Sequence, residues 1–207
     1  MTAAYIVDYL RSPFAPAMRG ALAGVRPDDL ASEVLKALVA RAGFDASEIE
    51  DVNLGCAFAE GEQGLNIARC VGLTAGLPQS VGGSTINRWC GSSMQAVQMA
   101  AGAIAMGAGD AFIAGGVESM SRVPMMGFNP MPNPAWSDAQ RIAFLNMGLT
   151  AENLADRYGV SREEQDAYSL ESQKKALAAR ADGRLAAEIT PIGDVTADGC
   201  PRETDAE

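Results

Sequence analysis

The chain has 207 residues, of which 48% are hydrophobic and 20% charged, and its formal net charge is −10 at pH 7. A strongly acidic chain is a poor partner for nucleic acid or for an anionic membrane surface, so we expect neither as a partner. No apolar run reaches transmembrane length, and Asp8 interrupts the one apolar stretch near the N-terminus, so we also expect no secretory signal.

The first half of the chain alternates short apolar runs with helical patterns. Residues 3–10 are rich in Ile, Val and Tyr, as a buried strand would be. Pro27, followed by two aspartates, begins a predicted helix that ends at Gly43. Further strands are predicted at 51–58, 81–86 and 110–117, and further helices at 63–73 and 91–107. Strands that alternate with helices imply crossover connections, and therefore an α/β fold with a largely parallel sheet.

The predicted helix at 91–107 is apolar on all sides. Its large apolar residues fall all around the axis, and alanine and glycine fill the remaining positions (Met94, Val97, Met99, Ile104 and Met106). A helix of this kind is buried on every side. We therefore expect it to lie at the centre of the fold.

Cys90 lies at the junction between the strand at 81–86 and this helix. A thiol at a helix N-terminus is close to the positive end of the helix dipole and to free backbone N–H groups. Both favour the thiolate, which is the nucleophilic form. The alternative is a structural cysteine in a buried helix, because free cysteine is among the most buried residue types. Local chemistry alone supports the two interpretations about equally.

The number and spacing of the cysteines indicate their redox state. The chain has four cysteines without paired spacing and no histidine. The cysteines fit free thiols in a reducing compartment, which predicts a cytoplasmic location. No motif surrounds Cys56, Cys70 or Cys200, so we interpret all three as structural.

After Val117 the pattern becomes irregular. Residues 121–136 are rich in Pro, Met, Asn and Gly, as functional or disordered loops are. Three methionines there, and a fourth further along the chain, could line an adaptable apolar pocket, although filling gaps in a core is the commoner use (Met125, Met126, Met131 and Met147).

Two helices and one strand are predicted in the remaining part. Thr150 is a candidate cap for a helix through Tyr158. Ser161 and Glu164 form a capping box that opens a second helix, which runs to about Ala181 with Gly183 as its stop. Residues 188–195 suggest a further strand, and residues 198–207 carry no pattern of ordered structure.

Several motifs together resemble the thiolases, especially the degradative 3-ketoacyl-CoA thiolase (acetyl-CoA acyltransferase) group. Residues 87–96, Asn-Arg-Trp-Cys-Gly-Ser-Ser-Met-Gln-Ala, resemble the family's nucleophile motif. Residues 114–121, Ala-Gly-Gly-Val-Glu-Ser-Met-Ser, resemble the segment after its fourth strand. Shorter similarities occur at 11–14, 147–153 and 161–166, so the resemblance covers almost the whole chain.

This resemblance implies a fold and a domain division. The thiolase-like fold repeats a βαβαβαββ unit with a mixed, mostly parallel sheet, and two such halves enclose a buried central helix layer. We expect residues 1–119 to form the N-terminal core half and residues 120–207 to form an incomplete loop (lid) domain. The C-terminal thiolase half would then be required as a partner.

The resemblance also implies an activity. Cys90 would attack an acyl-CoA thioester to form an acyl-enzyme, and the acyl group would pass to CoA or to an acetyl-CoA carbanion. The backbone N–H of Cys90 would be one oxyanion donor, and Met147 would lie beside the acyl and pantetheine groups. Coenzyme A enters as substrate or product, with no resident cofactor and no metal. Thiolases pair as homodimers and often as homotetramers, so we expect an oligomer.

The chain departs from the family in what it lacks. The second half of a thiolase supplies an Asn-Glu-Ala-Phe segment, a Gly-His-Pro histidine and a Cys-x-Gly cysteine, and none of these is present. Asn146 stands where many members carry histidine. Without these groups we expect the chain alone to be inactive. Two alternatives remain: a ketosynthase-like condensing enzyme, and a non-catalytic acyl-CoA-binding or scaffold half-protein.

Overall fold

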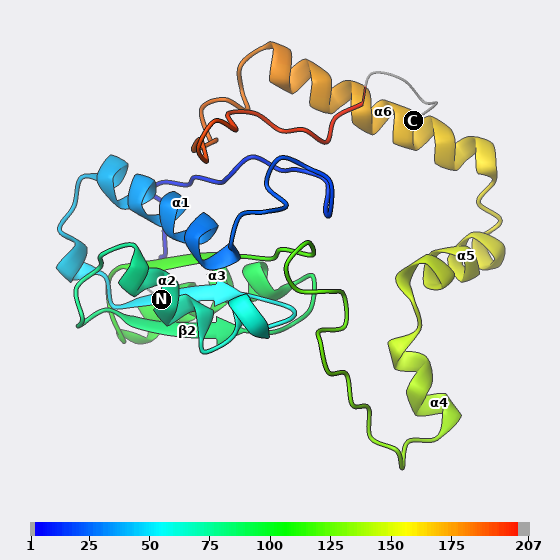
Figure 1. Cartoon of the computed structure of the whole chain (residues 1–207), viewed down its shortest axis with the longest axis horizontal. Coiled ribbons are helices and arrows are strands. Elements are labelled where there is room, and N and C mark those ends of the chain that lie inside the picture. The colour runs from blue at the N-terminus through cyan, green and yellow to red at the C-terminus, as the bar shows by residue number, and fades with distance from the viewer. Residues whose placement is uncertain (1–2, 203–207) are drawn as a thin grey trace. The chain divides into compact units, whose positions relative to one another are not determined.

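The computed structural model describes residues 3–202, which form two compact units (Figure 1). Of the described residues, the first unit contains those up to Asn129 together with Leu185–Cys200, and the second contains Pro130–Arg184 with Pro201 and Arg202. The expected division at residue 119 remains a prediction. Of the segment 198–207, which we expected to lack ordered structure, residues 203–207 lie outside the described residues.

The first unit is built on a parallel sheet, which confirms the α/β class. Within the described residues it has three strands in the order β2-β1-β3 (β1 Asp51–Gly55, β2 Gly82–Ile86, β3 Phe112–Gly116). In this register Val52 lies between Gly83 and Ile113. Helix α2 (Ile67–Thr74) connects β1 to β2, and helix α3 (Ser92–Met106) connects β2 to β3. The mixed sheet and the complete βαβαβαββ order remain predictions.

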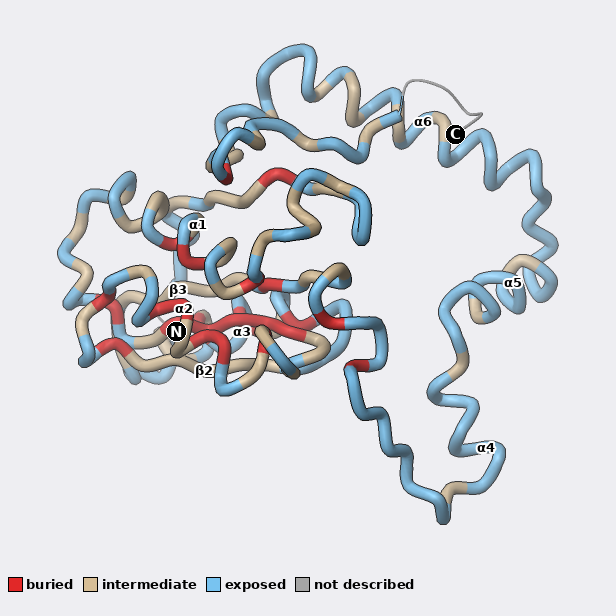
Figure 2. Tube along the Cα trace, viewed as in Figure 1, coloured by how far each residue is buried: buried red, intermediate tan, exposed pale blue. Residues whose placement is uncertain are grey.

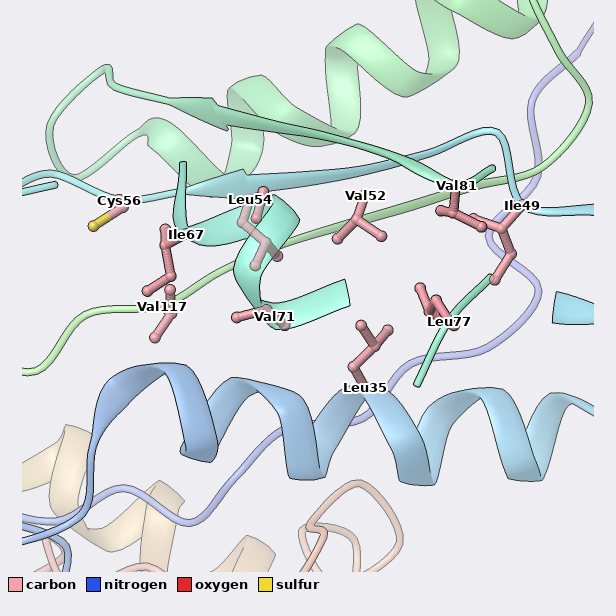
Figure 3. Packing of buried hydrophobic residues seen from close by; sticks show 11 residues of the cluster. Leu35, Ile49, Val52, Leu54, Cys56, Ile67, Val71, Leu77, Val81 and Val117 are labelled. Atoms are coloured by element: carbon pink, nitrogen blue, oxygen red, sulfur yellow. The ribbon is translucent and has the colours of Figure 1, made fainter. Parts of the chain in front are cut away.

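Helices α2 and α3 cover opposite faces of the sheet (Figure 3). The connection from β1 to β2 and the connection from β2 to β3 run in opposite directions across the sheet. Because such crossovers are right-handed, reversing the direction places the second helix on the other face. The side chains agree, since Gly83 abuts Arg69 of α2 whereas Gly55, which points to the other face, abuts Ser93 of α3.

Helix α1 (Pro27–Ala42) joins α2 on the same face and completes the core there, as Figure 3 shows. Pro27 is its first residue, Asp28 and Asp29 lie in its first turn, and Gly43 ends it with a φ of 70°. These are the predicted start and stop signals. The core is one apolar cluster between the two helices and the sheet (Leu35, Ile49, Val52, Leu54, Cys56, Ile67, Ala68, Val71, Leu77, Val81 and Val117).

On the opposite face, α3 packs directly against backbone. A Cβ atom at Gly55 would lie 2.4 Å from the backbone nitrogen of Ser93, and one at Gly116 would lie 2.0 Å from the Ser93 hydroxyl oxygen. Real Cβ atoms do not approach other atoms so closely. Glycine at the ends of β1 and β3 therefore allows the first turn of α3 to lie on the sheet.

The expected burial of α3 on every side is not found within this chain. Ser92, Ala96 and Ala100 are buried against the sheet. On the other faces Met94 is 69% exposed and Met106 is 82% exposed. The reason is geometric, because a single sheet can cover only one face of a helix.

Two predicted strands are absent from the described residues. Residues 3–10 form no ladder, and Tyr5 is 81% exposed. Residues 188–195 contribute only isolated bridges, one of them between Arg11 and Ile189. A β-rich sequence forms a strand only when a partner supplies backbone hydrogen bonds along its length, and no strand pairs with either segment here.

Arg11, near the start of the chain, forms ion pairs with two carboxylates of the segment at 185–200, which belongs to the same unit. Its Nε lies 2.7 Å from a carboxylate oxygen of Glu188, and its Nη1 lies 2.8 Å from Asp198 Oδ1. Asp198 Oδ1 also accepts a hydrogen bond from the backbone N–H of Phe14. Hydrogen bonding to Asp198, followed by that to Glu188, raises the pKa of Arg11 above its usual value. This loop, which carries the motif at 11–14, thus holds together two segments distant in sequence.

The second unit consists of short and long helices that bury little (Figure 2). Its helices α4, α5 and α6 contain no buried residue (Asp138–Arg141, Met147–Tyr158 and Arg162–Ala181). The capping box of Ser161 and Glu164 opens α6 as predicted. Helix α5 differs, because Asn146 caps it and Thr150 lies inside it. The described residues also form three short 3-10 helices, two in the first unit and one in the second (η1 Ala46–Glu48, η2 Gly61–Gln63 and η3 Ile142–Phe144).

We predict that Gly55→Ala destabilises the protein far more than Gly115→Ala. The new methyl group at position 55 meets backbone atoms of Ser92 and Ser93, and overpacking of this kind costs about 3 kcal/mol. At position 115 the nearest atom to the new methyl group is Leu54 Cδ2 at 3.6 Å, an ordinary contact, so alanine there should change the unfolding free energy by less than about 1 kcal/mol. Urea unfolding monitored by circular dichroism measures both, and equal values would contradict the close packing of α3.

We also predict that the chain self-associates through the outer face of α3. Burying one large apolar side chain contributes about 1.5–3 kcal/mol to stability. The total for several such side chains is comparable to the net free energy of unfolding of a domain, about 5–15 kcal/mol. The double variant Met94→Gln/Met106→Gln should associate less than the parent in size-exclusion chromatography with light scattering. Met131→Gln is the control, because Met131 is 80% exposed but lies in the second unit. A monodisperse parent monomer with a sharp cooperative melt would contradict this expectation.

Candidate active site

The three strands end at one edge of the sheet, because they are parallel, and each continues into a polar loop. The backbone N–H of Cys56, after β1, donates to the carbonyl of Ile86 at 3.0 Å. The N–H of Val117, after β3, donates to the carbonyl of Gly55 at 3.0 Å. The pairing thus extends one residue past β1 and β3 and aligns the three loops. Such an edge is where open α/β sheets bind ligands.

Cys90 lies exposed in the loop after β2, two residues before α3 begins. The backbone N–H of Gly91 donates to the carbonyl of Arg88 at 3.0 Å, and that of Ser92 donates to the carbonyl of Trp89 at 3.1 Å. These bonds form a tight turn around the cysteine. The sequence-based placement of Cys90 at the start of this helix is therefore matched by the structure, with Gly91 as the N-cap residue.

Ser92 closes this turn from inside. Its side chain is buried, and its Oγ accepts a hydrogen bond from the Arg88 N–H at 2.8 Å and donates one to the Trp89 carbonyl at 2.5 Å. From the sequence we expected Ser92 only to leave the sulfur accessible. Its role in fixing the turn depends on its burial, which the sequence does not reveal.

Trp89 adopts a backbone conformation that is unusual for a bulky residue. Its φ is 48°, in the left-handed region that favours glycine. Asn87 Oδ1 accepts the Trp89 N–H at 2.9 Å, and the ring of Phe58 lies 5.5 Å from the Trp89 ring, centroid to centroid. The residue before the cysteine is thus held on both its backbone and its side chain.

A buried glutamine connects the loops after β1 and β3. Gln63 Nε2 donates to the Phe58 carbonyl at 2.8 Å and to a Glu118 carboxylate oxygen at 2.6 Å. Its Oε1 accepts the Ser119 N–H at 2.6 Å, and Glu118 in turn accepts the Ala57 N–H at 2.7 Å. Sequence reasoning missed Gln63. The available signal was Glu118, which lies in the motif at 114–121.

The four cysteines occupy different environments. Cys56 is buried, and burial, with a further contribution from the negative charge of Glu118, raises its pKa to about 11. Cys70 is half-buried, and its Sγ donates to the Leu65 carbonyl at 3.4 Å. Cys90 and Cys200 are exposed. Exposure alone therefore does not distinguish Cys90 from Cys200, whereas its position at the sheet edge does.

Met147, the second expected site residue, belongs to the second unit. It is the first residue of α5 and is 67% exposed. Asn146 Oδ1 caps this helix by accepting the Gly148 N–H at 2.8 Å. Its expected location beside the acyl and pantetheine groups remains a prediction.

A cavity of about 460 Å³ lies in the first unit, and Glu118 and Ser119 of the loop after β3 are among its lining residues. It is lined by apolar residues of α1 and β3 and by the loop at 11–17, and Cys90 is not among its lining residues. Among the described residues, no group of three or more His, Cys, Asp or Glu side chains is arranged to hold a metal ion. Over the same residues, no helix is long and apolar enough to span a membrane.

Comparison with known proteins identifies the family. The family model described as "Thiolase, N-terminal domain" matches residues 4–207. The chain belongs to the thiolase family. It is 47% identical over 192 residues to the 3-ketoacyl-CoA thiolase of Bacillus subtilis (strain 168), covering 93% of this chain and 49% of that protein. It is 46% identical over 197 residues to the 3-ketoacyl-CoA thiolase of Acinetobacter baumannii (strain AYE), covering 94% and 50%.

These matches confirm the resemblance drawn from the motifs. A third relative, the 3-ketoacyl-CoA thiolase of Psychrobacter cryohalolentis, is 46% identical over 190 residues, covering 90% of this chain and 48% of that protein. The chain therefore spans about half the length of the curated relatives that it matches. Asn87, Cys90 and Glu118 lie within the described residues, in the loops at the carboxyl edge of the sheet.

We predict that Cys90 reacts with iodoacetamide faster than the other three cysteines. At pH 8 the buried Cys56 remains a thiol, because its pKa is raised to about 11, and should label slowest. Cys200 is the matched control, since it is equally classed as exposed but lies outside the sheet edge. Peptide mapping by mass spectrometry gives each rate. Faster labelling of Cys56, Cys70 or Cys200 would contradict the special position of Cys90.

Proposed function

We propose that this chain supplies the nucleophile of a thiolase-type acyl transfer between acyl-CoA thioesters, with Cys90 as the acylated residue. The observation that carries the proposal is the exposed thiol in a tight turn at the start of α3, on the carboxyl edge of the sheet. Membership of the thiolase family, whose curated relatives bear the name 3-ketoacyl-CoA thiolase, supports the reaction class. The proposal covers both 3-ketoacyl-CoA thiolysis and the reverse Claisen condensation.

The covalent step can be written with balanced atoms. The Cys90 thiolate adds to the C3 carbonyl of a 3-ketoacyl-CoA, and the resulting oxyanion collapses by breaking the C2–C3 bond. Acetyl-CoA leaves as a carbanion that takes one proton, and the shortened acyl group remains on Cys90. The thiol of a free CoA then gives its proton to the acid–base group that protonated the carbanion and attacks this acyl-enzyme, so that a new acyl-CoA forms and the Cys90 thiolate is regenerated.

Two requirements of this chemistry fall on different parts of the protein. The negative charge of the oxyanion must be stabilised by hydrogen-bond donors, and we propose the backbone N–H of Cys90 as one of them. The proton transfers need an acid–base group, and the chain contains no histidine that could serve. We propose that a C-terminal thiolase half supplies this group, with the chain acting as a homodimer or homotetramer. We further propose Met147 as a contact for the acyl or pantetheine group, coenzyme A as substrate or product, no resident cofactor or metal, and a cytoplasmic location.

The absence of histidine also favours a second candidate, a non-catalytic acyl-CoA-binding half-protein. The two candidates differ in what happens to Cys90. A binding protein holds the thioester intact, whereas a nucleophile exchanges it. A ketosynthase-like enzyme would acylate the same cysteine, but the Gly-Gly-Val-Glu-Ser-Met segment, in which Glu118 ties the loops together, favours the thiolase assignment.

We predict that the chain alone shows no thiolysis of acetoacetyl-CoA and that adding the C-terminal half of a related thiolase restores it. Loss of a general base lowers the rate about 10²–10⁴-fold. Restored activity should disappear in Cys90→Ala and persist in the control Cys200→Ala, and intact-mass analysis should show the acyl group on Cys90. Thiolysis by the isolated chain would contradict this account, and so would restored activity in Cys90→Ala.

A further inference from the structure

We propose that Asn87 is the positioning residue that fixes Cys90 for acyl transfer, an inference that rests on the proposed function of Cys90. Asn87 does not contain a reacting atom. Its amide makes two hydrogen bonds, one to the residue before the cysteine and one to the loop after β1. Through these two bonds it joins the cysteine turn to the rest of the sheet edge.

The first bond stabilises the turn. Asn87 Oδ1 accepts the Trp89 N–H at 2.9 Å, and Trp89 holds a φ of 48°. Bulky residues avoid this region unless surrounding contacts hold them there. The direction in which Cys90 leaves the backbone follows directly from this φ. Losing the acceptor therefore allows Trp89 to relax and the thiol to move.

The second bond fixes the turn in space. Asn87 Nδ2 donates to the Ala57 carbonyl at 2.8 Å. The N–H of the same Ala57 donates to Glu118 at 2.7 Å, and Gln63 donates to the other oxygen of Glu118 at 2.6 Å. These hydrogen bonds fix the position of the loop after β2 relative to the loops after β1 and β3. Asn87 thus joins the cysteine turn to this network by a side-chain hydrogen bond.

Fixing the nucleophile matters because catalysis is sensitive to small displacements. Reacting atoms must be held near attack geometry, and a misplacement of about 1 Å can cost about 10²-fold in rate. Residues that lock the nucleophile from behind supply this precision. An amide suits the task here, because it offers a donor to the Ala57 carbonyl and an acceptor to the Trp89 N–H without adding charge beside the thiol.

The chain contains a matched control for Asn87. Asn66 also makes two side-chain hydrogen bonds within the first unit, donating to the Gly83 carbonyl and accepting from the Thr85 hydroxyl, both at 2.8 Å. It also has a positive φ, 56°. Its bonds connect the start of α2 to β2 and do not reach the cysteine turn. Asn66→Ala therefore removes similar interactions while leaving Cys90 in place.

The experiment measures the Cys90 thiol and the Trp89 ring in the whole chain. In a Trp136→Phe background Trp89 is the sole tryptophan, so its fluorescence reports the turn. We expect Asn87→Ala to shift this emission and to change the limiting high-pH alkylation rate of Cys90 about tenfold, the scale of two lost hydrogen bonds. Asn66→Ala should lower the melting temperature but alter neither signal, and the Cys200 rate should stay constant throughout.

A Cys90 rate within twofold of the parent in Asn87→Ala would overturn the proposal, as would an equal change in Asn66→Ala. If Asn87→Ala does not fold, Asn87→Ser replaces it, because serine keeps an acceptor for the N–H two residues on and loses the donor to Ala57 without adding charge beside the thiol. Its Cys90 rate should then change by less than tenfold but more than twofold, and no change would again overturn the proposal.

Acylation separates this proposal from the proposed function. The chain joined by a C-terminal thiolase half is incubated with acetoacetyl-CoA and its mass is recorded. Acylated Cys90 together with an unaltered Asn87→Ala alkylation rate would overturn the positioning role alone. No acylation at Cys90, together with the expected Asn87 effects, would overturn the nucleophile role and leave Asn87 as the residue that sets the geometry of the thiol.

Discussion

The first turn of α3 lies against the backbone of β1 and β3, and the candidate site depends on this contact. Glycine at positions 55 and 116 removes the atoms that would hold the helix away from the sheet. With α3 seated there, the preceding turn must emerge at the carboxyl edge. The location of Cys90 is thus a consequence of packing between backbones, and a methyl group on the sheet would displace the thiol together with the helix.

The loops at this edge are held by hydrogen bonds of three neutral side chains and one carboxylate. Gln63 and Asn87 contribute amides, Ser92 contributes a hydroxyl, and Glu118 accepts from both a side-chain amide and a backbone N–H. Amide and hydroxyl groups keep the same charge across the physiological pH range, so Gln63, Asn87 and Ser92 hold these loops without adding charge. Burial separates the two thiols near this edge, because Cys56 is enclosed and protonated while Cys90 is open to solvent.

The sequence predicts local features well and relations between distant segments poorly. Pro27 and Gly43 correctly mark the ends of α1, and the capping box at Ser161 correctly opens α6, because such signals act within one turn. The strand expected at 3–10 fails, since pairing depends on a partner that the pattern does not specify. In the site, the position of Cys90 follows from its motif. The roles of Gln63 and Asn87 require the register of three strands, which spacing along one chain does not supply.

The exposed face of α3 couples stability to the proposed chemistry. Met94 lies in the first turn of the helix, close in sequence to Cys90, and is largely exposed. Any surface that covers the apolar side of α3 therefore extends to the neighbourhood of the thiol. Under the proposed function, a C-terminal half at that surface would also supply the acid–base group, since this chain contains no histidine. A C-terminal half that covered α3 would then complete both the fold and the site, whereas a second copy of this chain would cover the helix without supplying a histidine.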